Sequence, residues 1–425
     1  MLKKLLSDKA MRHRLLITLG LLCIYRLGIH LRVPGVAPED IQQLQNIGAL
    51  GYLDTLTGGG LTRYSLFALG VSPYITASII MQLLQMDLIP SFTEWAKQGH
   101  TGRQKLNQWT KYFATFFAIT QGTALVYGLR YLSITAQEAL AKETGVVKEV
   151  LHYGGHNQQL LAIFTLVVGS LITIWIADQI TQYGLGNGTS LIIFTGILSQ
   201  LPKELYSLTQ KSFNWTYLIA IPLFLIGVYI IIKIDRSEYR IPIYYAKRYR
   251  KEAERSYFPL KLNSAGVIPV IFASSVMMLP ETFASLLNVH RPWLQFLSLQ
   301  SYTGILLYAV LIMLFTFFYA HIQINPEEAA KQLEQQGGYI PTIRPGKDTE
   351  SYLKRKINSL SLPGGLFLTL IAVIPMLVSK WAPGLNFALA GTSLLIVISV
   401  ALETTEQIRG KLMKHDYQDL SREVT

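Results

Sequence analysis

The chain reads TLTGGGLTRYSLFALGVSPYI over residues 55–75, and this stretch decides the fold. It begins polar and rich in glycine, becomes apolar, and is interrupted at Gly70 and Pro73. Polar side chains, among them Gln82 and Gln85, are scattered through the apolar residues that follow. A membrane helix tolerates such interruptions only where protein or a water-filled cavity satisfies the freed backbone groups. The stretch therefore predicts a broken membrane span.

Further apolar runs lie on both sides of this stretch. Half of the 425 residues are hydrophobic and 15% are charged, which is too apolar for a soluble surface. A helix needs about 20 mostly apolar residues to cross a bilayer. One such run is also compatible with a buried soluble helix, but a soluble core does not contain ten. The predicted spans lie near residues 15–31, 65–86, 108–129, 158–177, 188–202, 213–232, 263–282, 302–321, 362–379 and 384–402.

The seventh predicted span resembles the second. It mixes Asn263, Ser264 and Ser274 with apolar residues and is interrupted at Gly266 and Pro269. Small and polar residues within a span normally serve helix packing. Two broken spans five positions apart also suggest a repeated architecture around a central path. The predicted fold is therefore an all-α, polytopic membrane protein with ten transmembrane helices in two pseudo-symmetric five-helix halves, residues 1–206 and 207–425, around a central pore.

The basic residues predict the orientation of the chain. The formal net charge is +12, from 38 Lys and Arg against 26 Asp and Glu. On the ten-span topology, 28 of the basic residues lie on one side and 9 on the other, with Arg26 inside the first span. Positive charge collects in cytoplasmic loops, so both termini are expected in the cytoplasm. Arg26 lies near the outer end of the first span, from which it can extend outward to water, and a structural role is favoured over a functional one.

The segment before the first span is basic, like the start of a signal peptide, but no small-x-small cleavage site follows it. We therefore expect this span to be retained. Cys23 is the one cysteine, which excludes an internal disulfide.

Several kinds of chemistry have no signal in the sequence. No phosphate-binding loop, metal-ligand spacing or nucleophile motif occurs, so no cofactor and no enzymatic activity are expected. The predicted spans also carry almost no ionisable residues, which ion-coupled transporters usually keep near the bilayer centre. This favours a passive channel over a secondary transporter of a small solute, and a scaffold that recruits RNA or ribosomes is a third, weaker alternative.

Two loops predicted on the cytoplasmic side are large and basic. The loop of residues 233–261 interleaves aromatic residues with Lys247, Arg248 and Arg250, and the loop of residues 325–361 contains Arg344. Orientation requires only a few basic residues, so such a cluster predicts a polyanionic partner. Ribosomal RNA, an acidic protein and anionic lipid all fit this charge.

Five segments together resemble the SecY family of protein-conducting channels, and the resemblance covers essentially the whole chain. These segments are residues 69–80, 178–190, 265–275, 341–346 and 391–397. The resemblance implies a pore closed by a ring of aliphatic side chains and a short plug helix. An apolar constriction excludes water and ions by dewetting, yet yields around a passing chain. Matched by motif, the ring consists of Val71, Ile75, Ile193, Ile271 and Ile396; ordinary helix packing is the alternative for each.

The resemblance also implies the moving parts of such a channel. The plug is expected near residues 55–66, with Thr57, Gly58, Gly59, Gly60, Leu61 and Arg63, because a segment that moves needs flexible positions. The second and seventh spans are expected to separate as a lateral gate, with polar contacts from Gln82, Gln85 and Asn263.

The expected partners follow from the same resemblance. They are the small membrane subunits SecE and SecG, the motor ATPase SecA, the ribosome, signal peptides, unfolded translocating chains and membrane lipid. Docking of the motor or the ribosome is expected at Lys247, Arg248, Arg250 and Arg344. The expected location is the bacterial cytoplasmic membrane, and an external motor would explain the missing phosphate loop.

Overall fold

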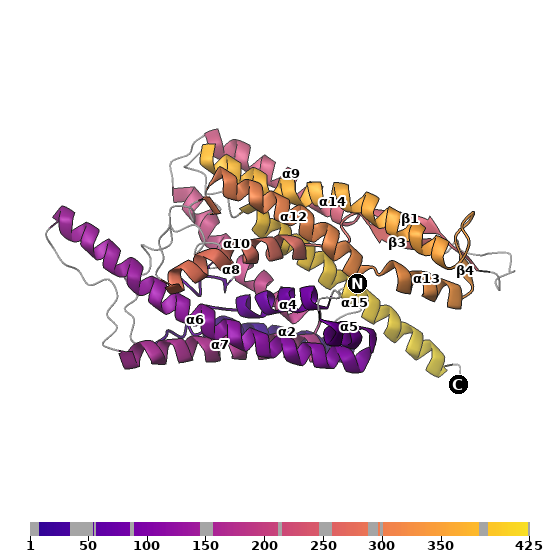
Figure 1. The fold of residues 1–425 in the computed structure, drawn as a ribbon, viewed down its shortest axis with the longest axis horizontal. Helices are drawn as coiled ribbons and strands as arrows, with labels where there is room; N and C mark the ends of the chain where they lie inside the picture. The colour runs from indigo at the N-terminus through magenta and orange to yellow at the C-terminus, as the bar shows by residue number, and fades with distance from the viewer. Residues whose placement is uncertain are drawn as a thin grey trace. The chain divides into compact units, whose positions relative to one another are not determined.

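The computed structural model describes residues 8–34, 54, 57–85, 89–144, 156–210, 215–245, 257–287, 296–297, 301–381 and 390–423. Most of these residues are helical (Figure 1). The helices are α2 (Lys9–Gly28), α4 (Ser72–Leu84), α5 (Pro90–Lys97), α6 (His100–Thr144), α7 (His156–Tyr183), α8 (Gly188–Gln210), α9 (Trp215–Asp235), α10 (Ile268–Leu287), α12 (Tyr302–Gln323), α13 (Pro326–Gln335), α14 (Lys347–Trp381) and α15 (Ala390–Glu423). The strands are β1 (Glu238–Pro242), β2 (Tyr244–Tyr245), β3 (Tyr257–Lys261) and β4 (Gly338–Tyr339).

The chain forms two compact units. The first comprises Met1–Ser212, Ser275–Ser301 and Val400–Thr425, and the second comprises Phe213–Ser274 and Tyr302–Ser399. Within the described residues, α7, α12 and α14 contain stretches long and apolar enough to cross a membrane. Shorter apolar stretches lie in α4, α8 and α10. The number of ten spans stays a prediction.

Small side chains bring the helices of the first unit close together. α4 packs against α6, α6 packs against α7, and α7 also contacts α2 and α8. Ala77 of α4 and Ala114 of α6 are fully buried in one contact cluster. Small residues at such contacts let helix backbones approach closely. A second cluster joins Tyr64, which precedes α4, to Val126 of α6 and Leu166 of α7.

The end of α15 packs against the start of α2 within the first unit. The side chains in this contact are Met11, Leu15, Leu185, Ile408 and Leu412. Lys411 Nζ donates a hydrogen bond to the Gly184 carbonyl at 3.2 Å, and the Leu185 amide donates to Thr18 Oγ1 at 2.9 Å. Partial burial, with a smaller effect of the nearby Arg14, lowers the pKa of Lys411 below its usual value. The carboxyl-terminal helix therefore stabilises the turn between α7 and α8.

In the second unit α12 packs along α14 (Figure 1). Antiparallel strands β1 and β3 pair from Glu238 opposite Lys261 to Pro242 opposite Tyr257. β2 pairs with β4, where the rings of Tyr244 and Tyr339 stack at 6.1 Å. Both ladders belong to the loops that the sequence predicts to be large and basic. Their core residues are Ile241, Leu260, Ala320, Ile340, Leu353 and Ile357.

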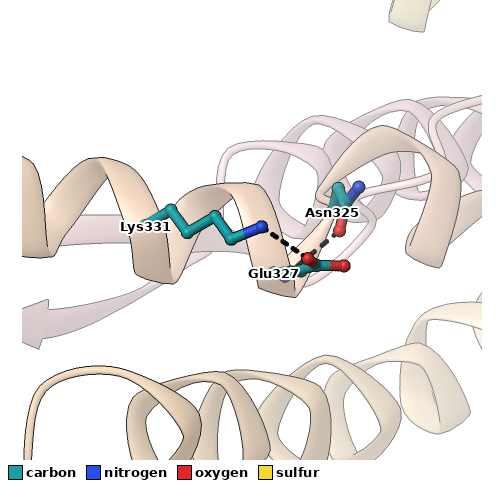
Figure 2. A network of polar contacts seen from close by, with 3 residues as sticks. All are labelled: Asn325, Glu327 and Lys331. Carbon is teal, nitrogen blue, oxygen red and sulfur yellow. Dashed lines mark hydrogen bonds and ion pairs between the residues drawn. The ribbon is translucent and has the colours of Figure 1, made fainter. Parts of the chain in front are cut away.

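The start of α13 is fixed by local hydrogen bonds. Asn325 caps the helix, and its Oδ1 accepts a hydrogen bond from the Glu327 amide at 3.1 Å (Figure 2). Pro326 occupies the first helical position, where no backbone donor is needed. Glu327 Oε1 accepts a hydrogen bond from Lys331 Nζ at 2.6 Å, and this bond raises the pKa of Lys331.

Candidate functional site

The broken second span is a series of turns followed by a helix. Residues 58–71 form turns and a single β-bridge, and α4 begins only at Ser72. Gly70 has φ +52°, a left-handed conformation that glycine adopts without steric cost. Pro73 lies in the first turn of α4, where a backbone N–H would have no helical partner. The span predicted to begin at residue 65 therefore becomes helical later, and we call residues 66–71 the first lead-in turn.

The same local sequence precedes α10. Residues 70–75 read GVSPYI and residues 266–271 read GVIPVI, so the motif Gly-Val-x-Pro-x-Ile occurs twice. Gly266 has φ +64°, and α10 begins at Ile268, so Pro269 again lies in the first helical turn. Residues 262–267, the second lead-in turn, are likewise turns, although the predicted span begins at 263. Both units thus begin an equivalent helix in the same way.

A glycine from a packed helix contacts each lead-in turn. A Cβ added to Gly169 of α7 would lie 1.8 Å from the carbonyl oxygen of Leu66. A Cβ added to Gly364 of α14 would lie 2.5 Å from the carbonyl oxygen of Leu262. Both distances are far inside van der Waals contact, so neither position accepts a side chain without a backbone shift. The sequence analysis missed these two glycines, although the repeated motif marks the turns that they contact.

The five predicted ring residues are all buried. Val71 and Ile75 are 5% and 6% exposed, and the Ile75 amide donates to the Val71 carbonyl at 3.0 Å in the first turn of α4. Ile193 lies on α8 in the same unit and is buried. Ile271 of α10 and Ile396 of α15 are buried in the second unit. Val71, Ile75 and Ile271 lie at the starts of α4 and α10. Ile193 lies on α8, and Ile396 lies on α15.

The described part of the predicted plug, which we call the 57–66 segment, is packed inside the first unit. The predicted plug residues Thr57, Gly58, Gly59, Gly60 and Leu61 are buried and Arg63 is half-buried, while residues 55 and 56 lie outside the described part. Backbone hydrogen bonds join the segment to the residues after α2: the Val33 amide donates to the Tyr64 carbonyl at 2.9 Å, and the Leu66 amide donates to the Leu31 carbonyl at 2.7 Å. The end of the segment is therefore anchored.

Side chains that the sequence analysis assigned otherwise, or missed, also hold this segment. Arg26 Nη1 donates to the Gly58 carbonyl at 2.9 Å, so Arg26 binds the segment instead of extending outward to water. Asp54 Oδ1 accepts from the Thr62 amide at 2.8 Å, and Gln200 Nε2 of α8 donates to Asp54 Oδ2 at 3.4 Å. In the sequence, Arg26 stood out only as a charge inside a predicted span. Nothing in the sequence marked Asp54 or Gln200 as a contact of this segment.

The three predicted gate residues have different surroundings. Gln82 Oε1 is buried and accepts no hydrogen bond from the described residues. Gln85 caps the end of α4, and its carbonyl accepts from Thr93 Oγ1 at 3.2 Å. Asn263 is buried in the second unit, where its Nδ2 donates to Asp235 Oδ1 at 3.2 Å. Asn263 therefore has a partner within its own unit.

Arg344 lies in the loop between β4 and α14. Its side chain is exposed, and its carbonyl accepts from Thr349 Oγ1 at 2.9 Å. Thr342 has φ +68°, an uncommon conformation for a β-branched residue. Arg240 also lies over the Tyr257 ring at 4.7 Å on the nearby β1–β3 ladder. The other predicted docking residues, Lys247, Arg248 and Arg250, lie outside the described residues.

Comparison with known proteins identifies the family of this chain. The sequence model of the SecY family matches residues 65–405. The chain belongs to the SecY family. It is 40% identical to protein translocase subunit SecY 1 of Lactobacillus kefiranofaciens over 98% of both chains, and 40% identical to protein translocase subunit SecY of Staphylococcus epidermidis over 97% of both chains. The predicted resemblance is confirmed.

Solved structures agree at the level of the fold. A protein-conducting channel superposes with a TM-score of 0.66 and 21% identity, covering 95% of this chain and 92% of that one. A SecY protein whose plug domain stabilises the closed state of its channel has a TM-score of 0.64, 20% identity and the same coverage. Sec61 from the canine ribosome–channel complex has a TM-score of 0.63, 20% identity and the same coverage. The chain is an all-α, polytopic membrane protein of SecY type, as predicted.

Proposed function

We propose that this chain is the channel-forming subunit of a protein translocase, which moves secretory proteins across the cytoplasmic membrane and releases membrane proteins sideways into it. The observation that carries the proposal is the 40% identity, over 98% of both chains, to a protein translocase subunit. The fold is also shared with a protein-conducting channel. No observation favours a transporter of small solutes.

The closure of the channel is assigned to apolar and small residues. Val71, Ile75, Ile193, Ile271 and Ile396 form the constriction, because an apolar ring stops ions without binding the passing chain. The 57–66 segment acts as the plug, and its burial in the first unit supports this role. In a related SecY protein the plug domain maintains a membrane seal. Gln82 and Gln85 at the end of α4, and Asn263 in the turn before α10, are the proposed lateral-gate residues.

The docking face is assigned to the second unit. This unit contains the exposed Arg344 and the stacked rings of Tyr244 and Tyr339, and its sequence adds the basic residues Lys247, Arg248 and Arg250. Ribosomal RNA is a proposed partner because a related channel occurs in a ribosome complex. The motor ATPase SecA is a second proposed partner, because the chain belongs to the SecY family. SecE and SecG are the proposed membrane subunits. Both termini are proposed to be cytoplasmic. The energy for translocation is proposed to come from the bound motor or the ribosome.

A photocrosslinking experiment tests the channel. A photoreactive amino acid at Ile75 should form an adduct with a secretory chain stalled during export, because this residue would line the path. The same probe at Phe116, which is 62% exposed on the outer side of α6, is the matched control and should react with lipid. Adducts at both positions, or at neither, would contradict the proposal.

A further inference from the structure

The 57–66 segment is bound by two consecutive side chains of α2. Arg26 Nη1 donates to the Gly58 carbonyl at 2.9 Å, and the Tyr25 hydroxyl donates to the Thr57 carbonyl at 3.4 Å. The Tyr25 ring is fully buried and stacks on Phe67 at 5.5 Å. Two neighbouring carbonyls of the segment are thus satisfied by one helix, and one of these bonds carries a full positive charge.

Asp54 holds the segment from its other side. Its two carboxylate oxygens accept hydrogen bonds from the Thr62 amide at 2.8 Å and the Thr62 hydroxyl at 3.2 Å. Gln200 Nε2 of α8 donates to the same carboxylate at 3.4 Å. Asp54 is 8% exposed, and a buried carboxylate is stable only while it is hydrogen-bonded. Moving the segment away from Asp54 would break the two hydrogen bonds from Thr62, and moving Asp54 with the segment would break the one from Gln200.

The backbone of the segment contacts α8 directly between these two attachments. A Cβ on Gly58 would lie 2.8 Å from Gly196 Cα and 2.8 Å from Arg26 Nη1. Gly58 and Gly59 have φ +73° and +86°. The absence of side chains therefore lets the segment approach both α2 and α8 closely enough for the hydrogen bonds to form.

One charge on the segment opposes this attachment. Arg63 lies close enough to Arg26 for the two positive charges to interact unfavourably. The segment thus carries a hydrogen bond to the Arg26 guanidinium at Gly58 and a positive charge at Arg63 that opposes the charge of Arg26. Removing either charge should shift the balance in an opposite direction.

We propose that Arg26, Asp54 and Gln200 form a latch that holds the 57–66 segment in the closed conformation and sets how rarely the resting channel opens. The latch rests on the proposed plug role of this segment. A hydrogen bond to a charged group contributes enough free energy to change an equilibrium about ten- to a hundred-fold, and a neutral one about two- to ten-fold. Arg26 makes the shorter bond, 2.9 Å against 3.4 Å for Gln200, so loss of Arg26 is the more severe change.

Two readouts on the full chain, purified with its accompanying subunits and reconstituted in vesicles, test the latch. The first is ion conductance at rest. The second is labelling of Thr57→Cys, in a Cys23→Ala background, by a membrane-impermeant maleimide applied to both faces. Thr57 is 3% exposed, so labelling reports displacement of the segment. Arg26→Gln should raise both readouts about ten- to a hundred-fold, and Arg63→Gln should raise neither.

Arg12→Gln is the matched control, because Arg12 is exposed on the same helix and should leave both readouts unchanged. Gln200→Leu should raise labelling about two- to ten-fold, a milder change because its hydrogen bond to Asp54 is long at 3.4 Å, and it serves if Arg26→Gln does not fold. Unchanged labelling in every variant that folds would overturn the latch without affecting the crosslink at Ile75. Increased labelling with unchanged conductance would show that the three residues hold the segment, but would contradict both its plug role and their control of resting opening.

Discussion

The first lead-in turn, before α4, and the second, before α10, share a motif, a glycine with positive φ and a leucine carbonyl contacted by a helix glycine. They differ in what covers the motif glycine. A Cβ on Gly70 would lie 3.0 Å from Thr57 Cγ2, whereas a Cβ on Gly266 would meet no described atom within 4 Å. The motif therefore builds the turn in both units, and the 57–66 segment adds a cover to the first. This additional contact makes the first lead-in turn, and not the second, a candidate gating element.

The largest expected effect comes from the two helix glycines. Gly169→Ala should destabilise the protein by about 3 kcal/mol and Gly364→Ala by about 2 kcal/mol, because overpacking against a backbone carbonyl forces the helices apart. Unfolding of the purified protein in mixed micelles, titrated with SDS, measures both changes.

Gly20→Ala is the matched control, because Gly20 lies inside α2 with nothing within 4 Å. It should stabilise the protein slightly, since alanine favours helix over glycine by about 1 kcal/mol. If Gly364→Ala destabilises the protein more than Gly169→Ala, the two contacts are not equivalent in the way that the comparison requires.

An intermediate effect is expected at the motif glycines. Gly266→Ala should destabilise the protein by about 1 kcal/mol, because alanine is strained in the left-handed conformation. Gly70→Ala should destabilise it by about 2 kcal/mol, because its Cβ also crowds Thr57. The same SDS titration measures the difference.

A double mutant sharpens this result. Thr57→Ser removes the Cγ2 methyl that the new Cβ at position 70 would meet, so it should recover about 0.5–1 kcal/mol in the Gly70→Ala background. The same substitution combined with Gly266→Ala should be additive. Additivity in both combinations would show that Thr57 does not crowd Gly70.

The smallest effect is expected at the motif prolines. Pro73→Ala and Pro269→Ala should each destabilise the protein by about 0.5 kcal/mol, because the unfolded chain gains conformational freedom while the first helical turn loses no hydrogen bond. Equal effects in the two units would support a shared local code. A large loss at one proline alone would mean that tertiary packing, and not the local sequence, places that helix start.

Much of the local structure could be predicted from the sequence. Breaks at Gly70, Pro73, Gly266 and Pro269 were expected, because φ preferences and the missing proline donor act within a few residues. The start of each helix was still placed too early, since the apolar runs extend through both lead-in turns. Hydropathy reports burial in protein or lipid, and a buried turn is as apolar as a buried helix.

The contacts that hold the candidate plug were not predictable in this way. Gly58 is 32 residues from Arg26, and Asp54 is 146 residues from Gln200. Arg26 carried a charge into an apolar run, which marked it as unusual without naming its partner. The stacking of Tyr244 on Tyr339 was hidden for the same reason, because the two strands come from different loops.

The sequence by itself determined the membrane character, the SecY-type motifs and the two backbone turns, because these depend on composition and on dihedral preferences of single residues. Only the tertiary structure decided that Arg26 binds Gly58, that Gly169 and Gly364 contact equivalent leucine carbonyls, and that Asn263 pairs with Asp235. Such contacts depend on how helices far apart in the sequence pack, and the packing energy is shared among many side chains at once.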